Sequence, residues 1–460
     1  MRYQGMKRLI FTLLMCWCLT AAAQNVTISG RTNKSNSLVR LFTYDELLTA
    51  TGNQAATTQS DDKGFFILEC TIKKTLSARI FIGLEDVDLF ITPNATYDVE
   101  IIVPEQDNNV SYFDKEHPTL RIKRTSDKGI SRQLFTANEI INTYLIDHFA
   151  QIYRGRQTRY LDSIQAAIDK EMPDIKSDFV KSHIRYKIAS IRLAINTDGG
   201  KKVIGDYFDG QKPLYAQPAY MELFKELFGN YFNKSQYDIH VLNDAFLTGP
   251  AAFKEYLDTD PFMKRNPCLA ELITIYNLQQ LCNADAETRY YAKAHLEQIR
   301  KNTAYSEHRT IIDNIFARQN RLAPGTDATD FELNNTKGGK TKLSDYKNEL
   351  VLIQFVDGYS PVSERQFSRL QDLHHQWQDS VQIITISTKD KVDFYKKQFD
   401  EKHYDWPLLN LGNDILLLEA YNVKTFPEYI LVKRGSKIAE APAPSPEQAI
   451  ETHVKKLYKK

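Results

Sequence analysis

The chain has 460 residues, of which 42% are hydrophobic and 25% charged, with 19 Gly and 16 Pro. This composition excludes a collagenous, low-complexity or wholly disordered chain, and at roughly 100–200 residues per domain the length predicts two to four domains. Lys and Arg total 59 against 58 Asp and Glu, so the chain lacks the basic excess expected of a nucleic-acid-binding protein.

The first 23 residues have the pattern of a secretory signal peptide. Arg2, Lys7 and Arg8 precede a short apolar run, which ends in the small residues 21–23. The run is shorter than the about 20 residues of a membrane span, so an uncleaved anchor is the weaker alternative. Cleavage after residue 23 would leave 56 basic and 58 acidic residues. We therefore expect a periplasmic or other cell-envelope protein of a Gram-negative bacterium, with no stable membrane span after cleavage.

The five cysteines are too few for disulfide bonds to stabilise an exported chain of this size. Cys16 and Cys18 lie in the predicted signal, which leaves Cys70, Cys268 and Cys282. Disulfide-stabilised secreted domains are small and cysteine-dense, so hydrophobic cores must hold this chain together. Cys268 and Cys282 fall in one predicted helix, about 21 Å apart at 1.5 Å rise per residue, which is far beyond disulfide range. We expect both to be core thiols.

Residues 24–105 are predicted to form a β-sandwich domain. Short segments rich in β-branched and aromatic residues are separated by turn residues such as Asp61–Gly64, and they span residues 26–30, 38–42, 64–68, 78–82, 89–91 and 97–101. The order of Ser29-Gly30-Arg31, Asp62–Phe66 and Ile91–Tyr97 resembles the N-terminal β-domain of a group of bacterial envelope proteins. In that group, the β-domain often precedes a thioredoxin-like domain.

Residues 106–321 are predicted to form a mainly α-helical domain. Apolar residues recur there at three- and four-residue steps, and the predicted helices span residues 134–153, 175–195, 220–232, 268–281 and 290–299. The aromatic-rich stretch from Tyr207 to Phe224 is compatible with a ligand groove. Aromatic residues at helical spacing are more typical of a core, which is the interpretation we favour.

Residues 322–460 alternate predicted strands and helices, which is typical of an α/β sheet. Strands are expected at residues 331–333, 342–343, 350–356, 381–387, 429–432 and 437–439, and helices at 361–378, 392–399, 415–421 and from 446 onward. The chain as a whole is predicted to be a multidomain α+β protein with an N-terminal β-sandwich, an α-helical middle and a C-terminal α/β domain.

Several segments of this C-terminal domain resemble the thioredoxin-like proteins of the TlpA and peroxiredoxin superfamily. Leu322–Gly325, Asp330–Leu333, Lys342–Tyr346 and Leu350–Phe355 are similar to the opening of that family, and Tyr421–Val432 is similar to the segment that holds its cis-proline. The resemblance implies a thioredoxin-like fold for residues 322–460. It also implies that Pro427 is the cis-proline.

The resemblance places the family's site at residues where this chain departs from the family pattern. In the family, an aromatic residue and then Cys-x-x-Cys follow the first long strand, whereas both cysteine positions here are serines, Ser360 and Ser363, after Tyr359. A serine hydroxyl cannot form the mixed disulfide of thiol exchange. Gln354 stands where thioredoxin itself buries an acid. We therefore expect the usual redox reaction, and any catalytic residue at this site, to be absent.

Ser360 also has little of what a nucleophile of another kind would need. The segment lacks the second glycine of a nucleophile elbow, and His374 and His375 lie three to four helical turns away. A helix N-cap at Ser360, followed by Pro361 as the first helical residue, accounts for the same sequence. The ten histidines show no metal-ligand spacing, and no phosphate loop or cofactor motif is present.

The leading hypothesis is a binding or scaffolding protein of the cell envelope, with no cofactor and no metal, whose partners are protein or peptide segments. Such segments would pair with the backbone beside the proline as an added strand. The candidate surface consists of Tyr359, Ser360, Pro361, Ser363, Phe426 and Pro427. The alternative is a thiol-disulfide oxidoreductase or peroxidase-like enzyme that uses a cysteine outside the motif, for which Cys70 would have to approach this site.

Overall fold

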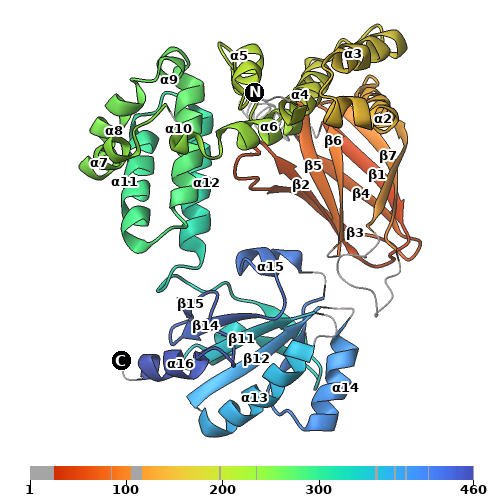
Figure 1. The fold of residues 1–460 in the computed structure, drawn as a ribbon. Helices are drawn as coiled ribbons and strands as arrows, with labels where there is room; N and C mark the ends of the chain where they lie inside the picture. The colour runs from red at the N-terminus through yellow and green to blue at the C-terminus, as the bar shows by residue number, and fades with distance from the viewer. Residues whose placement is uncertain are drawn as a thin grey trace, which may run out of the picture. The chain divides into compact units, whose positions relative to one another are not determined.

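A computed structural model describes residues 25–83, 85–104, 117–195, 198–234, 236–357, 361–377, 380–388, 391–412 and 414–458. The predicted signal peptide lies outside these residues. The described chain forms two compact units, one mainly from residues 25–308 and the other mainly from residues 309–460. Figure 1 shows the elements of both units, each of which is considered by itself.

The β-strands of the first unit form two four-stranded sheets within its described residues (Figure 1). One sheet has the order β4-β1-β7-β8 and the other β3-β2-β5-β6. Burial alternates along β1, as expected for a strand with one face against a core. The strands are β1 Val26–Thr32, β2 Leu38–Tyr44, β3 Asn53–Gln59, β4 Phe65–Cys70, β5 Leu76–Ile82, β6 Glu85–Ile91, β7 Ala95–Ile102 and β8 Thr119–Thr125.

The six predicted strands of this region are confirmed, and two further strands were not predicted. The strand β3 is rich in Asn, Gln, Ala and Thr, and β8 carries three basic residues in seven. Both lie at sheet edges, where a strand buries little apolar surface and leaves little hydrophobic signal. The strand β8 falls in the segment predicted to be mainly helical, yet it pairs with β7 through Val99 and Ile122. The sandwich and the three-domain division stay predictions.

The remainder of the first unit is helical. The segment predicted as one helix over residues 134–153 consists of α2 and a π-helical turn, η2. The elements are α2 Ile130–Asp147, η2 Ala150–Arg154, α3 Arg159–Glu171, α4 Asp178–Ile195, α5 Lys201–Tyr207, α6 Pro218–Phe228, η3 Tyr231–Asn233, α7 Ile239–Thr248, α8 Pro250–Leu257, α9 Pro261–Arg265, α10 Pro267–Leu281 and α11 Ala286–Asn302, before α12 Ser306–Arg321 leads into the second unit. Phe208, Tyr220 and Phe224 are fully buried, which confirms the core interpretation of the aromatic stretch.

A loop of the β-region is bonded to the helical region. The backbone N–H of Leu47 donates to the carbonyl of Tyr215 at 2.8 Å, and Lys225 Nζ donates to the carbonyl of Leu47 at 2.7 Å. These bonds join segments that are more than 160 residues apart in the sequence. They help to explain why β-region and helices count as one compact unit.

The second unit is built on a sheet of order β10-β9-β13-β12-β11-β14-β15 within its described residues. The central strand β11 is parallel to β12 and antiparallel to β14. The elements are β9 Glu332–Asn335, β10 Lys340–Lys342, η4 Leu343–Tyr346, β11 Leu350–Val356, α13 Pro361–Trp377, β12 Val381–Ser387, α14 Val392–Lys402, β13 Leu408–Asn410, α15 Ile415–Ala420, β14 Glu428–Lys433, β15 Lys437–Glu440 and α16 Ile450–Tyr458. All but β13 and η4 were predicted as strands or helices, with ends that differ by a few residues.

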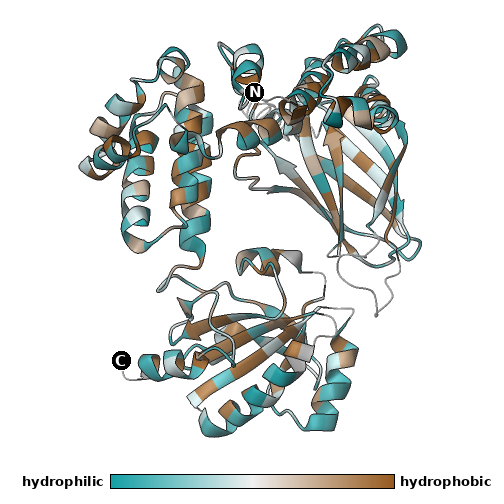
Figure 2. Ribbon diagram, viewed as in Figure 1, coloured by the Kyte–Doolittle hydropathy of each residue, from teal (hydrophilic) through white to brown (hydrophobic). Residues whose placement is uncertain are grey.

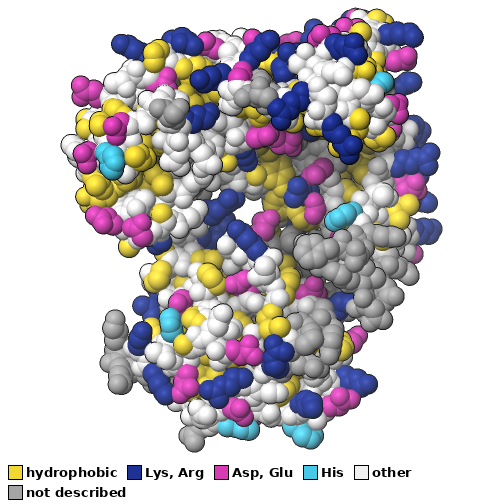
Figure 3. Space-filling view, viewed as in Figure 1, with side chains coloured by type: hydrophobic (Ala, Val, Ile, Leu, Met, Phe, Trp, Pro, Cys, Tyr) yellow, Lys and Arg dark blue, Asp and Glu magenta, His cyan; other side chains and the backbone are white. Residues whose placement is uncertain are grey.

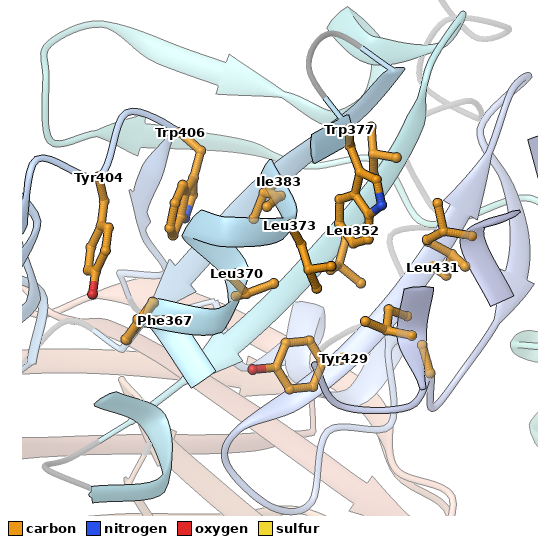
Figure 4. Close-up of a cluster of buried hydrophobic side chains, with 14 of the residues drawn as sticks. Leu352, Phe367, Leu370, Leu373, Trp377, Ile383, Tyr404, Trp406, Tyr429 and Leu431 are labelled. Carbon is orange, nitrogen blue, oxygen red and sulfur yellow. The ribbon is translucent and has the colours of Figure 1, made fainter. Parts of the chain in front are cut away.

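Two hydrophobic clusters cover the two faces of this sheet. Leu352 belongs to the cluster that contains α13, α14 and α16 residues, and Ile353 belongs to the cluster around α15. Figure 4 shows Phe367, Leu370 and Leu373 of α13 among the strand residues of the first cluster. The strands are brown in Figure 2, whereas the outer faces of α13 and α14 are largely teal. Every side chain of β11 is buried, which fixes the position of the residues that follow it.

Basic and acidic side chains are interspersed on the visible surface, without a large area of one sign (Figure 3). Among the described residues, no helix combines the length and apolarity needed to cross a membrane. Nor do those residues gather three or more His, Cys, Asp or Glu side chains in a metal-binding arrangement.

Candidate functional site

The structure brings the end of β11 and the proline segment together. Phe355 on β11 is paired with Glu428 on β14, and the Phe426–Pro427 peptide bond before Glu428 is cis. Pro361 begins α13, with Ser363 in its first turn, as the predicted helix start requires. Tyr359 and Ser360, and the side chains of Pro361 and Ser363, lie outside the described residues. The contacts of the candidate surface are therefore known on its proline side.

Phe426 is only partly exposed at the candidate surface. Its side chain is half-buried and packs against the hydrophobic cluster around α15. Lys424 and Thr425, just before it, are exposed. The exposed part of the segment is therefore Lys424–Thr425, and Phe426 anchors that segment to the core.

Glu428 is a residue of this site that sequence reasoning missed. Its carboxylate is half-buried directly after Pro427 and accepts a hydrogen bond from Thr425 Oγ1 at 3.2 Å. Burial raises the pKa of Glu428, while the bond from Thr425 and the charge of Lys424 oppose the shift. Only its position directly after the proline could have indicated it, because a charged residue at the start of a strand is common and by itself indicates no function.

Beneath the site, Gln354 lies in a chain of buried hydrogen bonds. Gln354 is fully buried; its Nε2 donates to Tyr429 Oη at 2.8 Å, and its Oε1 accepts from Thr385 Oγ1 at 3.0 Å. The Tyr429 hydroxyl donates to Gln366 Oε1 at 2.8 Å, and Trp406 Nε1 donates to Thr385 Oγ1 at 3.0 Å. The chain thus joins β11, β12, β14 and α13, and it satisfies the polar atoms that the fold buries there.

Every member of this chain is neutral at physiological pH. Amides, a hydroxyl and an indole do not ionise there, and burial raises the pKa of Tyr429 well above its ordinary value. The position that holds an acid in thioredoxin therefore offers no exchangeable charge here. The hydrogen bonds from Gln354 through Tyr429 to Gln366 connect β11 to α13, the two elements on either side of residues 358–360.

The three cysteines of the described residues lie outside the thioredoxin-like unit. Cys70 and Cys282 are buried, and burial raises the pKa of both thiols. Cys282 follows the last residue of α10 and matches the expectation of a core thiol. Cys268 does not, because it is only half-buried and lies beside His308. Cys70 lies in β4 of the first unit, and its approach to the proline segment of the second unit stays a prediction.

Comparison with known proteins agrees with this architecture. The AhpC/TSA family profile matches residues 324–441. Thiol-disulfide oxidoreductase ResA of Geobacillus kaustophilus is 24% identical over 132 residues, which are 28% of this chain and 75% of the relative. The ResA protein of Bacillus cereus is 25% identical over 153 residues, 32% of this chain and 86% of the relative.

Solved structures cover the same part of the chain. The thioredoxin domain of a Bacteroides vulgatus thiol-disulfide oxidoreductase is 26% identical, with a TM-score of 0.27, over 30% of this chain and 99% of that domain. A putative thiol-disulfide oxidoreductase of the same species is 22% identical, with a TM-score of 0.28, over 30% of this chain and 98% of the other. The family profile and the ResA relatives together show that the C-terminal part of this chain is a thioredoxin-like domain whose homologues are thiol-disulfide oxidoreductases.

Proposed function

We propose that this protein is exported to the cell envelope, where its thioredoxin-like domain binds protein or peptide segments without redox chemistry. The observation that carries the proposal is the serine pair, Ser360 and Ser363, in a domain whose relatives are named for thiol-disulfide exchange. The sequence contains no cysteine after Cys282. A mixed disulfide cannot form at a site without a thiol, so this domain keeps the fold and lacks the reacting atom.

The neutral hydrogen-bond chain under the site supports the same proposal. An oxidoreductase of this fold must move protons as its thiols change state, and Gln354 cannot accept one. The loss of the thiols and the replacement of the acid are two separate changes, and both remove redox function. The remaining feature is a fixed backbone segment, Lys424–Glu428, next to the start of α13.

A peptide could add to this segment as an extended strand. In such recognition, main-chain hydrogen bonds supply affinity and neighbouring side chains supply selectivity. The surface would consist of Tyr359, Ser360, Pro361 and Ser363 on one side and Lys424–Pro427 on the other. Half-buried Glu428 would favour partners with a hydrogen-bond donor or a positive charge near its carboxylate.

The first test asks whether the serine pair is the reason for redox silence. Mature wild-type protein should not accelerate insulin reduction by dithiothreitol, whereas the double variant S360C/S363C should. The single variants S360C and S363C are matched controls, because each has one thiol and cannot form the intramolecular disulfide. A folded double variant without activity would contradict the placement of the site.

The second test measures binding directly. We expect an unfolded, cysteine-free polypeptide to bind the wild-type protein, and T425W to weaken that binding at least about tenfold, equal to about 1.4 kcal/mol, because the bulky ring would cover the exposed segment. K397W is the control, since Lys397 is an exposed residue of α14 with 79% side-chain exposure. Equal affinities of the wild-type protein and T425W would contradict the proposed surface.

Export rests on the sequence of residues 1–23. Expression in a Gram-negative host, followed by fractionation and N-terminal sequencing, should yield a periplasmic chain that begins near residue 24. A cytoplasmic chain that retains Met1 would contradict export. Retention in the membrane fraction with residues 1–23 intact would favour the uncleaved anchor.

The alternative, an enzyme that uses a cysteine outside the motif, predicts dithiol-dependent turnover of insulin or peroxide by the wild-type chain. Loss of that turnover in C70S would assign it to Cys70 and overturn the binding-only proposal. Burial of Cys70 in β4, with its raised pKa, weighs against this assignment.

A further inference from the structure

Five polar side chains meet in the helical region, far along the sequence from the proline site. His308 is completely buried, and its Nδ1 lies 2.6 Å from Glu271 Oε1. Its Nε2 lies 2.9 Å from the hydroxyl of Tyr215, which is itself 3.5 Å from the sulfur of Cys268. The same carboxylate oxygen of Glu271 also accepts a hydrogen bond from Thr303.

The arrangement fixes which nitrogen of His308 can act as a base. A carboxylate accepts hydrogen bonds, so Nδ1 carries a proton that it donates to Glu271. The Nε2 lone pair then accepts from the Tyr215 hydroxyl, which contacts the sulfur of Cys268. Burial alone would lower the pKa of His308, but its hydrogen bonds to Cys268 and Glu271 raise that pKa above its ordinary value. A group that orients the base, a base, and a thiol linked to that base through the Tyr215 hydroxyl are the parts of an activated cysteine nucleophile.

Cys268 differs from the other two described cysteines in what surrounds it. It is the second residue of α10, a helix of 15 residues that begins with Pro267, and the N-terminus of a helix favours negative charge. Its side chain is half-buried. Cys70 and Cys282 are buried and have no comparable base among the interactions of the described residues.

We propose that Cys268 is a hydroperoxide-reactive thiol, with His308 as its base and Glu271 as the residue that orients His308. The thiol gives its proton to the Tyr215 hydroxyl, whose own proton passes to His308 Nε2, and the thiolate attacks the terminal oxygen of the hydroperoxide. A sulfur–oxygen bond forms and the oxygen–oxygen bond breaks. The leaving alkoxide or hydroxide takes the proton from His308. Cys268 is oxidised to the sulfenic acid, and the peroxide is reduced to an alcohol or water.

The surroundings of the sulfur favour a small oxidant over a protein disulfide. The rings of Tyr215 and Tyr305 pack on His308 with centroid distances of 5.7 and 4.9 Å, and Cys268 is half-buried. The Tyr215 hydroxyl can also donate a hydrogen bond to the departing oxygen. Cys282 is fourteen residues along the chain, about 21 Å at helical rise, so an external thiol would have to resolve the sulfenic acid.

The test uses the full mature chain and one equivalent of hydrogen peroxide. Sulfenic acid is trapped with dimedone and located by peptide mass spectrometry. We expect the adduct at Cys268, with Cys70 and Cys282 as internal controls that remain unlabelled, and complete loss of label in C268S. A wild-type chain without label at Cys268 would overturn the proposal.

Base variants separate this chemistry from mere exposure of the sulfur. General-base catalysis contributes on the order of 100-fold or more, so H308Q should slow labelling of Cys268 at pH 7 at least about tenfold. Y215F, which keeps His308 and Glu271 but removes the hydroxyl between the sulfur and the base, should slow it by a similar factor. If H308Q does not fold, E271Q serves instead, because it keeps a partner for Thr303 but removes the charge. Labelling at wild-type rates in the folded variants would show that Cys268 is only exposed. Because these residues lie outside the thioredoxin-like unit, the result is independent of the serine-pair tests.

Discussion

Tyr429 is the central link of the buried chain under the candidate site, and removal of its hydroxyl gives a stability prediction that the structure allows to be worked out. Tyr429→Phe would leave Gln354 Nε2 and Gln366 Oε1 without their common partner. Both glutamines are at most 4% exposed, so solvent cannot replace the hydroxyl. An unsatisfied buried polar group costs about 1–3 kcal/mol. We therefore expect Tyr429→Phe to lower the free energy of unfolding by about 2–6 kcal/mol.

The matched control is Tyr421→Phe in the same domain. Tyr421 is 1% exposed, and its hydroxyl donates to the carbonyl of Thr329 at 2.7 Å. Its removal affects one partner instead of two, so the loss should be about 1–3 kcal/mol, half of that expected for Tyr429→Phe. The difference between the two variants isolates the effect of the glutamine chain from the general cost of losing a buried hydroxyl.

Tryptophan fluorescence during urea denaturation is a suitable assay. The chain has three tryptophans; Trp17 belongs to the predicted signal, whereas Trp377 and Trp406 lie in the thioredoxin-like domain. The emission of the mature chain therefore reports that domain. With a slope of about 2 kcal/mol per molar urea, a loss of 3 kcal/mol moves the midpoint by about 1.5 M. Equal midpoints for Tyr429→Phe and Tyr421→Phe would refute the reasoning.

Three further predictions concern other sites. In Gln354→Glu, a protonated carboxyl can take the place of the amide in the hydrogen-bond chain. Burial should raise the pKa of this carboxyl, so the free energy of unfolding, followed by tryptophan fluorescence, should fall as the pH rises above about 4.3, the ordinary glutamate value. A flat profile between pH 4 and 8 would contradict this prediction. Burial, and then the charge of Lys187, lower the pKa of His183 to about 4. The free energy of unfolding of the first unit should therefore fall by about 3 kcal/mol as the pH falls from about 6.5 to about 4. Unfolding followed by circular dichroism should show a smaller loss in His183→Gln. Gly64→Ala would place its Cβ 1.8 Å from the Thr32 carbonyl oxygen, at a φ of 76°. Gly129 has a similar φ of 82° but open space around it, so Gly129→Ala should lower the free energy of unfolding by only about 1–2 kcal/mol. Gly64→Ala should lower it by more.

Sequence reasoning was most successful where burial is continuous. The strands β11 and β12 were predicted at their observed limits because Val, Ile and Leu make up most of both segments, and such short apolar segments favour a buried strand. The strands β3, β8 and β13 were missed because two are polar edge strands and one has only three residues. Their pairing depends on neighbours that no local pattern reveals.

For the proline site and the Cys268 cluster too, features of the local sequence were predictable, whereas contacts with remote residues were not. The cis-proline and the burial of Gln354 were expected from the family resemblance, and both are observed. The partners of Gln354 were not predictable, since Tyr429 is 75 residues away and Thr385 is 31 residues away. Cys268 was expected to be a core thiol because its helix was evident while His308 and Tyr215 were remote. Polar contacts of this range require the tertiary fold.

The position of β1 in the middle of its sheet bears on how the protein is made. Val26 is paired with Cys70 on one side and with Ala95 on the other. A chain that emerges with its N-terminus first therefore carries β1 with one edge unpaired until β4 has followed, and with the other edge unpaired until β7 has followed. Unpaired edges are available to other chains, so this interval is when the protein most needs rapid emergence or a chaperone. It also means that a tag or truncation at residue 25 disturbs the middle of a sheet, whereas one near residue 458 follows a terminal helix.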